Sequence, residues 1–419
     1  MANILDEILE KLGSYLQLDL KYYIKNAFYL ISANIVSLIC GLLLSISFAR
    51  FLPKEIYGQY SYVMAILGIL AFFSLPGMNT AIVQAVARGY EGVFIEGVKM
   101  RFKWSILGSI SIFAIGIYYF LNGFVVVSKC LILCSLFFPF YYATDSLYSF
   151  LSGKKRFIEI AKYRSLIQVI STFLTVSVIY FSHNILLIIL IYLFTISFFK
   201  CVILLKQLKI VINKAIDKTA FTFGKHLTLM EIVSNFQPHF DRFIIGTFLS
   251  FPELATYAIA LAFSEQIRHI GVIISGVILP KLSEPNEKIA SSRFKKYLIS
   301  YTLFFALIFG TIFFFVPYII LFLFSDKYID SIFLAQILLI SAIVLQPAIV
   351  LNRAFFPAQR KVKELYIYRT SYPIFEITVI GILAYFHGVI GVAVGKFIAR
   401  VYATLLAILS VSYTHLTLP

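Results

Sequence analysis

Asp241 and Arg242 stand side by side in a stretch of sequence that is otherwise apolar enough to lie inside a membrane. A charge near the centre of a bilayer costs about 3 kcal/mol or more, so charges retained there indicate a functional site. Three further cations fall within apolar segments: Arg268, Lys396 and Arg400. Guanidinium and ammonium groups bind anionic oxygens. We therefore predict that these five residues bind substrate in a cavity, with Asp241 orienting Arg242.

A purely structural interpretation of the same charges stays open. Glu265 precedes Arg268 by three residues and could pair with it on one helical face. Arg242 could pair with Asp241 or with a neighbouring helix. Lys396 and Arg400 are four residues apart on one face, and long cationic side chains can extend to the membrane surface.

Acidic residues inside a membrane often couple transport to an ion. Four acids are candidates for binding H⁺ or Na⁺: Glu376, Glu265, Glu231 and Asp145. For each of them, a buried ion pair is the competing explanation. The histidines are scattered and the four cysteines follow no ligand spacing, so no metal site and no cofactor beyond a coupling ion are expected.

Prolines and glycines mark candidate hinges. Pro238 lies three residues before Asp241, and Pro76-Gly77 interrupts an apolar segment. Such breaks free backbone groups that can line a cavity. A static kink would leave the same sequence pattern.

Composition identifies the elements that must position these residues. The chain has 419 residues, 60% hydrophobic and only 13% charged, with mean hydropathy +0.91. Ordinary soluble domains have about 25% charged residues. A spanning helix needs about 20 apolar residues. We predict an all-α membrane protein with about twelve transmembrane helices, near 27–49, 57–80, 104–121, 125–150, 164–182, 185–205, 227–249, 254–279, 298–322, 331–352, 366–386 and 389–410.

The net charge of +16 is explained by membrane topology. Most Lys and Arg residues fall in alternate links between the predicted spans, and such links face the cytoplasm. Both termini are therefore expected in the cytoplasm, and no nucleic-acid partner is needed. The external links are short, and we find no nucleophile–base set or nucleotide-binding loop. These features argue against an enzyme.

The predicted spans suggest two six-helix bundles around a central cavity, a common transporter plan. An amphipathic cytoplasmic segment at 1–26 precedes them, and the polar end of the chain at 411–419 departs from the pattern of the rest. The predicted domains are 1–26, an N-terminal bundle at 27–206, a basic cytoplasmic linker at 207–226, a C-terminal bundle at 227–410, and the tail at 411–419.

Three regions resemble a known family. The first is 49–61 followed by 75–83, the second is 241–249 leading to Leu279-Pro-Lys-Leu-Ser283, and the third is 323–328 with 353–360. Their order and spacing are similar to those of polysaccharide repeat-unit flippases of the O-antigen and capsule type. These flippases are the polysaccharide-transporter branch of the superfamily that includes the MATE multidrug exporters and the lipid II flippases.

The resemblance implies movement of undecaprenyl-pyrophosphate-linked oligosaccharide repeat units from the cytoplasmic to the outer leaflet by alternating access. It places the protein in a bacterial cytoplasmic (inner) membrane. The implied partners are the lipid-linked oligosaccharide, membrane lipids, and polysaccharide polymerase and chain-length machinery. Two alternatives stay open at this point: an ion-coupled, MATE-like exporter of small organic cations, and a lipid II-type flippase.

Overall fold

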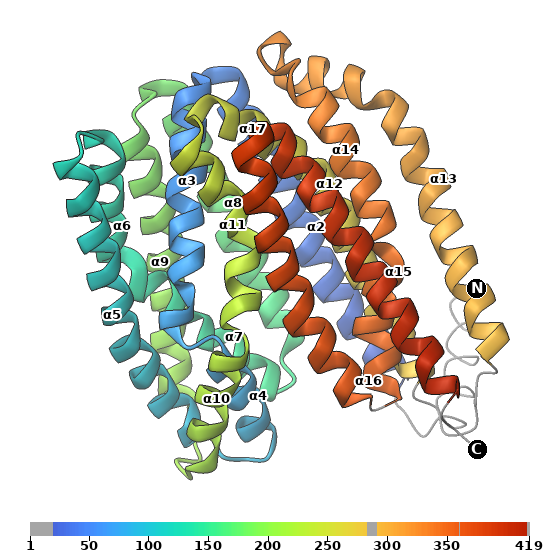
Figure 1. The fold of residues 1–419 in the computed structure, drawn as a ribbon. Coiled ribbons are helices and arrows are strands. Elements are labelled where there is room, and N and C mark those ends of the chain that lie inside the picture. Colours follow the sequence, from blue (N-terminus) through green and yellow to red (C-terminus); the bar gives the residue numbers. More distant parts are fainter. Residues whose placement is uncertain (1–19, 283–290, 360, 417–419) are drawn as a thin grey trace, which may run out of the picture. The chain divides into compact units, whose positions relative to one another are not determined.

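The computed structural model describes residues 20–282, 291–359 and 361–416, and all regular elements within them are helices (Figure 1). The predicted all-α membrane fold is therefore confirmed. Most of the predicted amphipathic segment, at 1–19, and the last residues of the predicted tail, 417–419, lie outside the described residues.

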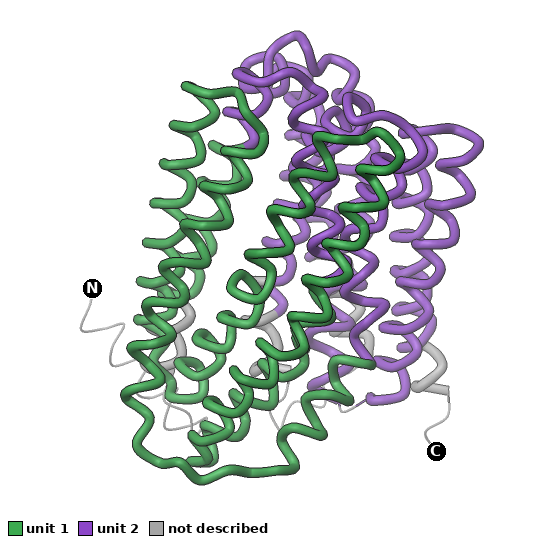
Figure 2. Tube along the Cα trace, turned by 90° about the vertical axis from the view of Figure 1, so that its left-hand side faces the viewer, with its two compact units in different colours: residues 1–44, 71–229 green, residues 45–70, 230–419 purple. Residues whose placement is uncertain are grey.

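The chain divides into two compact units, coloured separately in Figure 2. Unit 1 comprises residues 1–44 and 71–229, and unit 2 comprises residues 45–70 and 230–419. The predicted N-terminal bundle included 45–70, which pack within unit 2 instead. Hydropathy marks where a helix is apolar but carries no information about which bundle it joins.

Unit 1 takes its helices from α2 to α10, except for α3, which belongs to unit 2. α2 (Leu20–Phe51) belongs to unit 1 up to Leu44. The other elements of this unit are η1 (Ala71–Ser74), α4 (Gly77–Ala87), α5 (Gly92–Leu121), α6 (Val125–Tyr142), η2 (Ala143–Asp145), α7 (Ser146–Gly153), α8 (Phe157–Ser182), α9 (Ile185–Ile210) and α10 (Thr219–Met230). The predicted linker at 207–226 therefore contains the end of α9 and much of α10.

Unit 2 begins with the last turns of α2 and with α3 (Lys54–Leu70). It continues with α11 (Ile232–Phe248), α12 (Phe251–Leu282), α13 (Ser291–Phe324), η3 (Asp326–Tyr328), α14 (Ser331–Val344), α15 (Gln346–Val350), the π-helix η4 (Leu351–Phe355), α16 (Phe356–Ala358) and α17 (Val362–Leu416). α17 is two helices that meet at Gly388, whose φ of 56° and ψ of −140° suit a residue without a Cβ.

Eight described helices are long and apolar enough to cross a membrane, or up to nine with the bent pair Ser331–Val344 and Gln346–Ala358. One of the eight, Val362–Val411, covers both predicted spans 366–386 and 389–410. The predicted spans 227–249 and 254–279, which carry Arg242 and Arg268, are not among them. The chain is thus a multi-pass membrane protein, and the count of about twelve is not confirmed.

An interruption occurs at the predicted Pro76-Gly77 break. Leu75 has φ 52°, and α4 begins directly after Pro76. Gly77 lies against α10, where its N–H donates to Thr228 Oγ1 at 3.1 Å. By contrast, Pro238 lies inside α11, and the interruption nearest to it is at Glu231, between α10 and α11.

Arg101 of α5 supports the interrupted helices of unit 1. Its side chain is 1% exposed and donates to the carbonyl oxygens of Ser74 at 2.7 Å and Tyr142 at 2.8 Å. It also donates to Asn79 Oδ1 at 2.6 Å and Ser146 Oγ at 2.9 Å. Helix ends leave carbonyl groups unsatisfied. Arg101 satisfies one such carbonyl group at the end of η1 and one at the end of α6.

In unit 2, α11 packs closely against α3. A Cβ on Gly246 would come within 2.1 Å of the Tyr62 ring, and one on Gly68 within 2.3 Å of the His239 imidazole. Tyr62 Oη and Thr247 Oγ1 are also hydrogen-bonded at 2.8 Å. This contact holds α11, which carries Asp241 and Arg242, firmly within unit 2.

Candidate functional site

Unit 2 brings together six of the charged residues that the sequence singled out. They come from three helices: Asp241 from α11, Glu265 and Arg268 from α12, and Glu376, Lys396 and Arg400 from α17. All six take part in ion pairs with one another. We call these six residues the charge cluster.

Asp241 is the most enclosed acid of the charge cluster, with 0% exposure. Its Oδ2 accepts a hydrogen bond from Lys396 Nζ at 2.5 Å and another from Tyr257 Oη at 2.7 Å. Its Oδ1 accepts from the backbone N–H of Arg242 at 2.7 Å. The Asp241 carboxylate therefore holds Lys396, and it bonds to Arg242 through the backbone N–H.

Glu376 approaches the other side of Lys396. Its Oε1 lies 3.9 Å from Lys396 Nζ, and its Oε2 accepts from Gln237 Nε2 at 2.7 Å. Glu376 and Lys396 are 1% and 3% exposed. A buried lysine thus lies between two buried carboxylates. Lys396 does not extend to the surface, as the structural interpretation had allowed.

Glu265 links two arginines. Its Oε2 accepts from Arg268 Nε at 2.6 Å, which is the pairing that the sequence left open. Its Oε1 lies 3.3 Å from an amino group of Arg400, whose other amino group donates to Ser341 Oγ at 3.0 Å. Arg400 is 1% exposed, so it too remains inside the unit.

Arg242 differs from the cations of the charge cluster. No acid among the described residues lies within ion-pair distance of its side chain, and its buried Nε has no hydrogen-bond partner there. The residue as a whole is half-buried on α11. A guanidinium without a carboxylate partner keeps its hydrogen-bonding capacity for another anion.

Two arginines in the same unit were missed as site residues by the sequence analysis. Arg353, in the π-helix η4, interacts electrostatically with Arg268 and with Arg369 of α17. Neither Arg353 nor Arg369 has an ion pair within the described ranges, although Glu231 interacts electrostatically with Arg369. π-Helices occur frequently at functional sites.

These two arginines were missed because they lie in a basic link. Membrane topology already accounts for a basic residue in such a link, so the sequence gives no reason to ask which residues lie near it in space. The available signal was the pair Pro347 and Pro357, which flank Arg353 and predict an irregular helix.

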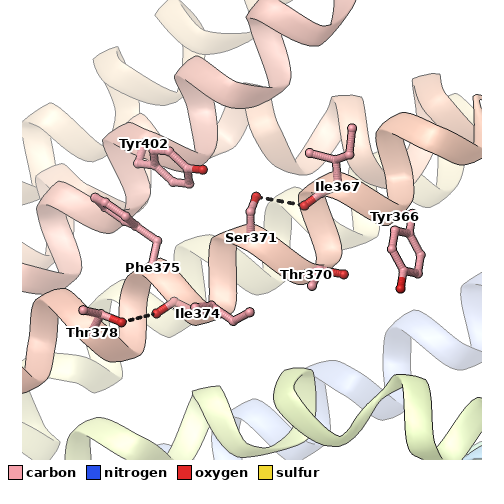
Figure 3. A pocket seen from close by; sticks show the side chains of 8 residues that line it. All are labelled: Tyr366, Ile367, Thr370, Ser371, Ile374, Phe375, Thr378 and Tyr402. Carbon is pink, nitrogen blue, oxygen red and sulfur yellow. Dashed lines mark hydrogen bonds between the residues drawn. The ribbon is translucent and has the colours of Figure 1, made fainter.

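A groove of about 570 Å³ follows the first half of α17, and Tyr402 contributes to it from the second half (Figure 3). Two of its five hydroxyl groups bond within their own helix: Ser371 Oγ donates to Ile367 O at 2.8 Å, and Thr378 Oγ1 to Ile374 O at 2.9 Å. The lining is therefore effectively apolar and fits a hydrocarbon chain. It consists of Tyr366, Ile367, Thr370, Ser371, Ile374, Phe375, Thr378 and Tyr402.

The remaining predicted acids have no ion pair with the charge cluster among the described residues. Asp145 is in unit 1, where its carboxylate accepts from Lys200 Nζ at 2.7 Å. Glu231 stands half-buried at the start of α11. Throughout the described ranges, no three His, Cys, Asp or Glu side chains gather closely enough to hold a metal ion.

Solved structures share this fold. The lipid II flippase MurJ, in an inward closed conformation, aligns with a TM-score of 0.73 and 17% identity, over 92% of this chain and 87% of MurJ. The MATE multidrug transporter DinF-BH aligns with a TM-score of 0.66 and 14% identity, over 94% of this chain and 95% of the transporter. At these identities the likeness concerns the fold alone.

Sequence comparison gives a more specific result. No curated protein matches the chain significantly. The family model described as polysaccharide biosynthesis protein matches residues 47–333, well over half of the chain. This match confirms the resemblance found in the sequence. The chain belongs to the polysaccharide biosynthesis protein family and has the fold shared by the MurJ flippase and the MATE transporters.

Proposed function

We propose that this protein is a flippase that moves undecaprenyl-pyrophosphate-linked oligosaccharide repeat units from the cytoplasmic to the outer leaflet by alternating access. The observation that carries the proposal is the family match over residues 47–333. The fold shared with MurJ and the MATE transporters supports membrane transport rather than catalysis.

The arginines of unit 2 would bind the pyrophosphate. Arg242, Arg353 and Arg369 have no carboxylate within ion-pair distance among the described side chains. Guanidinium groups stay charged and offer paired donors to phosphate oxygens. Lys396, Arg400 and Arg268 are already paired with acids, so we assign them to holding the site together and to shaping its positive field.

The groove on α17 would hold part of the hydrocarbon chain. Its apolar lining begins at Tyr366, only three residues from Arg369. A lipid phosphate bound by Arg369 could therefore place its first carbon atoms beside the groove. The stacked rings of Phe375 and Tyr402, 4.1 Å apart, close one wall of it (Figure 3).

A MATE-like exporter of organic cations is the first alternative. Such a substrate requires acids that are open to a cavity. In the charge cluster, Asp241, Glu265 and Glu376 all face cations of their own chain, so this cluster favours an anionic substrate. A lipid II-type flippase is the second alternative, and it would use the same arginines because its substrate is also a lipid pyrophosphate.

The proposed function implies a location, partners and a residue for ion coupling. The protein would reside in a bacterial cytoplasmic membrane with both termini in the cytoplasm. It would supply polysaccharide polymerase and chain-length machinery with substrate. Among the acids considered for ion coupling, Glu231 has no ion pair within the described residues and lies at the break between α10 and α11. It is therefore our candidate for proton coupling.

Translocation in proteoliposomes tests the proposal. Purified protein would be reconstituted with a fluorescent undecaprenyl-pyrophosphate oligosaccharide, and outer-leaflet label would be quenched over time. We expect label from the inner leaflet to become accessible, with no uptake of an organic-cation dye in parallel vesicles. Dye transport without movement of the lipid would favour the MATE-like alternative.

A further inference from the structure

Two buried carboxylates in unit 2 form an obvious place for a coupling cation. Asp241 and Glu376 approach each other from α11 and α17, and both are at most 1% exposed. Sodium and other hard cations prefer carboxylate and hydroxyl oxygens. The Tyr257 hydroxyl at 2.7 Å from Asp241 would complete such a ligand set.

Sodium does not fit this place, because Lys396 fills it. Its ammonium group lies 2.5 Å from Asp241 Oδ2 and 3.9 Å from Glu376 Oε1. A second cation between the same oxygens would stand next to a like charge in a region of low dielectric, where the repulsion is large.

The other carboxylate oxygens are also engaged. Asp241 Oδ1 accepts from the backbone N–H of Arg242, and Glu376 Oε2 accepts from Gln237. Glu376 Oε1 lies 3.9 Å from Lys396 Nζ, the ion-pair partner of Glu376 among the described residues, and Tyr372 also interacts with the Glu376 side chain. The ammonium thus supplies the charge compensation that a bound ion would otherwise provide.

We propose that Lys396 is a built-in cation that occupies the site of a dissociable alkali ion, so that no Na⁺ binds between Asp241 and Glu376. Lys396 therefore determines the ion specificity of unit 2. Removing its charge leaves two carboxylates and the Tyr257 hydroxyl group without a compensating cation. The Lys396→Met variant gains a site for Na⁺.

The test compares thermal unfolding of the purified full-length protein in NaCl, KCl and N-methylglucamine chloride at equal ionic strength. The wild type is expected to unfold at the same temperature in all three salts. For Lys396→Met we expect a midpoint that is about 4 °C or more higher in NaCl, because a ligand that binds only the folded state stabilises it. Lys396→Arg retains a positive charge and stays insensitive to sodium.

A matched control removes one of the exposed carboxylates. The double variant Lys396→Met with Asp241→Asn keeps only one buried carboxylate, that of Glu376, and its sodium response disappears. A folded Lys396→Met protein without any sodium response would overturn the proposal.

Binding of radioactive ²²Na⁺ to the wild type gives a test that does not depend on the folding of any lysine variant. We expect the wild type to show no saturable ²²Na⁺ binding at this site. Any binding that is measured should therefore be the same in the Asp241→Asn and Glu376→Gln variants. Saturable binding that either substitution abolishes would show that sodium occupies the site beside Lys396, and would contradict the proposal.

Discussion

Lys396 Nζ lies 2.5 Å from Asp241 Oδ2, an ion pair between residues 155 positions apart in the sequence. Both side chains are buried, so each requires the other. The pair joins α17 to α11 and changes the interpretation of the site. A charge inside a membrane is not automatically available to a substrate, and the available cations are those without an acidic partner.

The first prediction concerns the arginines at the basic end of unit 2. Arg353→Ala and Arg369→Ala should each reduce flipping of the lipid-linked oligosaccharide about tenfold or more, because a hydrogen bond to a charged group contributes about 1.5–3 kcal/mol. Initial rates in proteoliposomes provide the measurement. Folding should be unaffected, since neither residue has an ion pair in the described chain.

Lys363→Ala is the matched control for these arginines. Lys363 is exposed in the same basic segment and lines no part of the groove. Its substitution should leave the rate within about twofold of wild type, as expected for a solvated charge. Equal losses for Lys363, Arg353 and Arg369 variants would indicate a general surface-charge effect instead of a binding site.

The second prediction concerns Glu265. Glu265→Gln leaves the buried Arg400 without its acid and should destabilise the protein by about 3–5 kcal/mol, the usual cost of breaking a buried pair. Thermal unfolding in detergent measures the loss. Glu96→Gln removes a more exposed pair with Lys99 and should cost about 1 kcal/mol or less. If both variants were equally stable, Arg400 would have another source of compensation.

The third prediction concerns Arg101. Arg101→Met leaves the carbonyl oxygens of Ser74 and Tyr142 without their donor, at about 1–3 kcal/mol for each unsatisfied group. We expect a lower unfolding temperature and faster proteolysis near the Pro76 break. Arg101→Lys keeps the charge but offers fewer donors in a different geometry. Its unfolding temperature should lie between those of the wild type and the Met variant. Wild-type protease resistance in the Met variant would exclude the proposed role.

The fourth prediction is a pH dependence from Glu91, which precedes the span of α5. Burial raises the pKa of its carboxyl, but hydrogen bonds from Lys154 and from the Ile212 N–H, at 3.2 Å, lower it more. A lowered folded-state pKa stabilises the protein above the unfolded-state pKa, near 4.5. This stabilisation is lost as the pH falls through the folded-state value.

Unfolding temperatures between pH 7 and pH 3 check this dependence. The wild type should lose stability more steeply than Glu91→Gln below about pH 4.5, because the glutamine cannot take up the proton. At pH 7 the Gln variant should be the less stable of the two. If the unfolding temperatures of the wild type and Glu91→Gln changed with pH in parallel, Glu91 would not contribute to the pH dependence of stability.

Much of the architecture could be predicted from local sequence. The apolar runs that form α8 and α9 are joined by a short link at His183-Asn184, and Pro76-Gly77 marks a real interruption because proline cannot continue a helix hydrogen-bond ladder. The grouping of residues 45–70 with unit 2 could not be predicted, since it depends on contacts between distant segments such as Gly246 and Tyr62.

The site could be predicted only in part for the same reason. Apolar context identified Asp241, Lys396, Arg400 and Glu376 as charges needing explanation. It did not indicate that Lys396 would lie between two acids, because the partner of a buried charge depends on how each helix is rotated about its own axis. Arg353 was not predicted as a site residue because a charge near the end of a spanning helix has little free-energy cost. Its presence there therefore does not indicate a function.

The central claim is that unit 2 binds the pyrophosphate of a lipid-linked oligosaccharide through arginines without acidic partners. The most direct test measures flipping and surface polysaccharide for Arg242→Ala, alongside the protein level in the membrane. We predict that export of the repeat unit is abolished while the protein level and the unfolding temperature stay close to wild type. Unchanged surface polysaccharide with Arg242→Ala would contradict the claim.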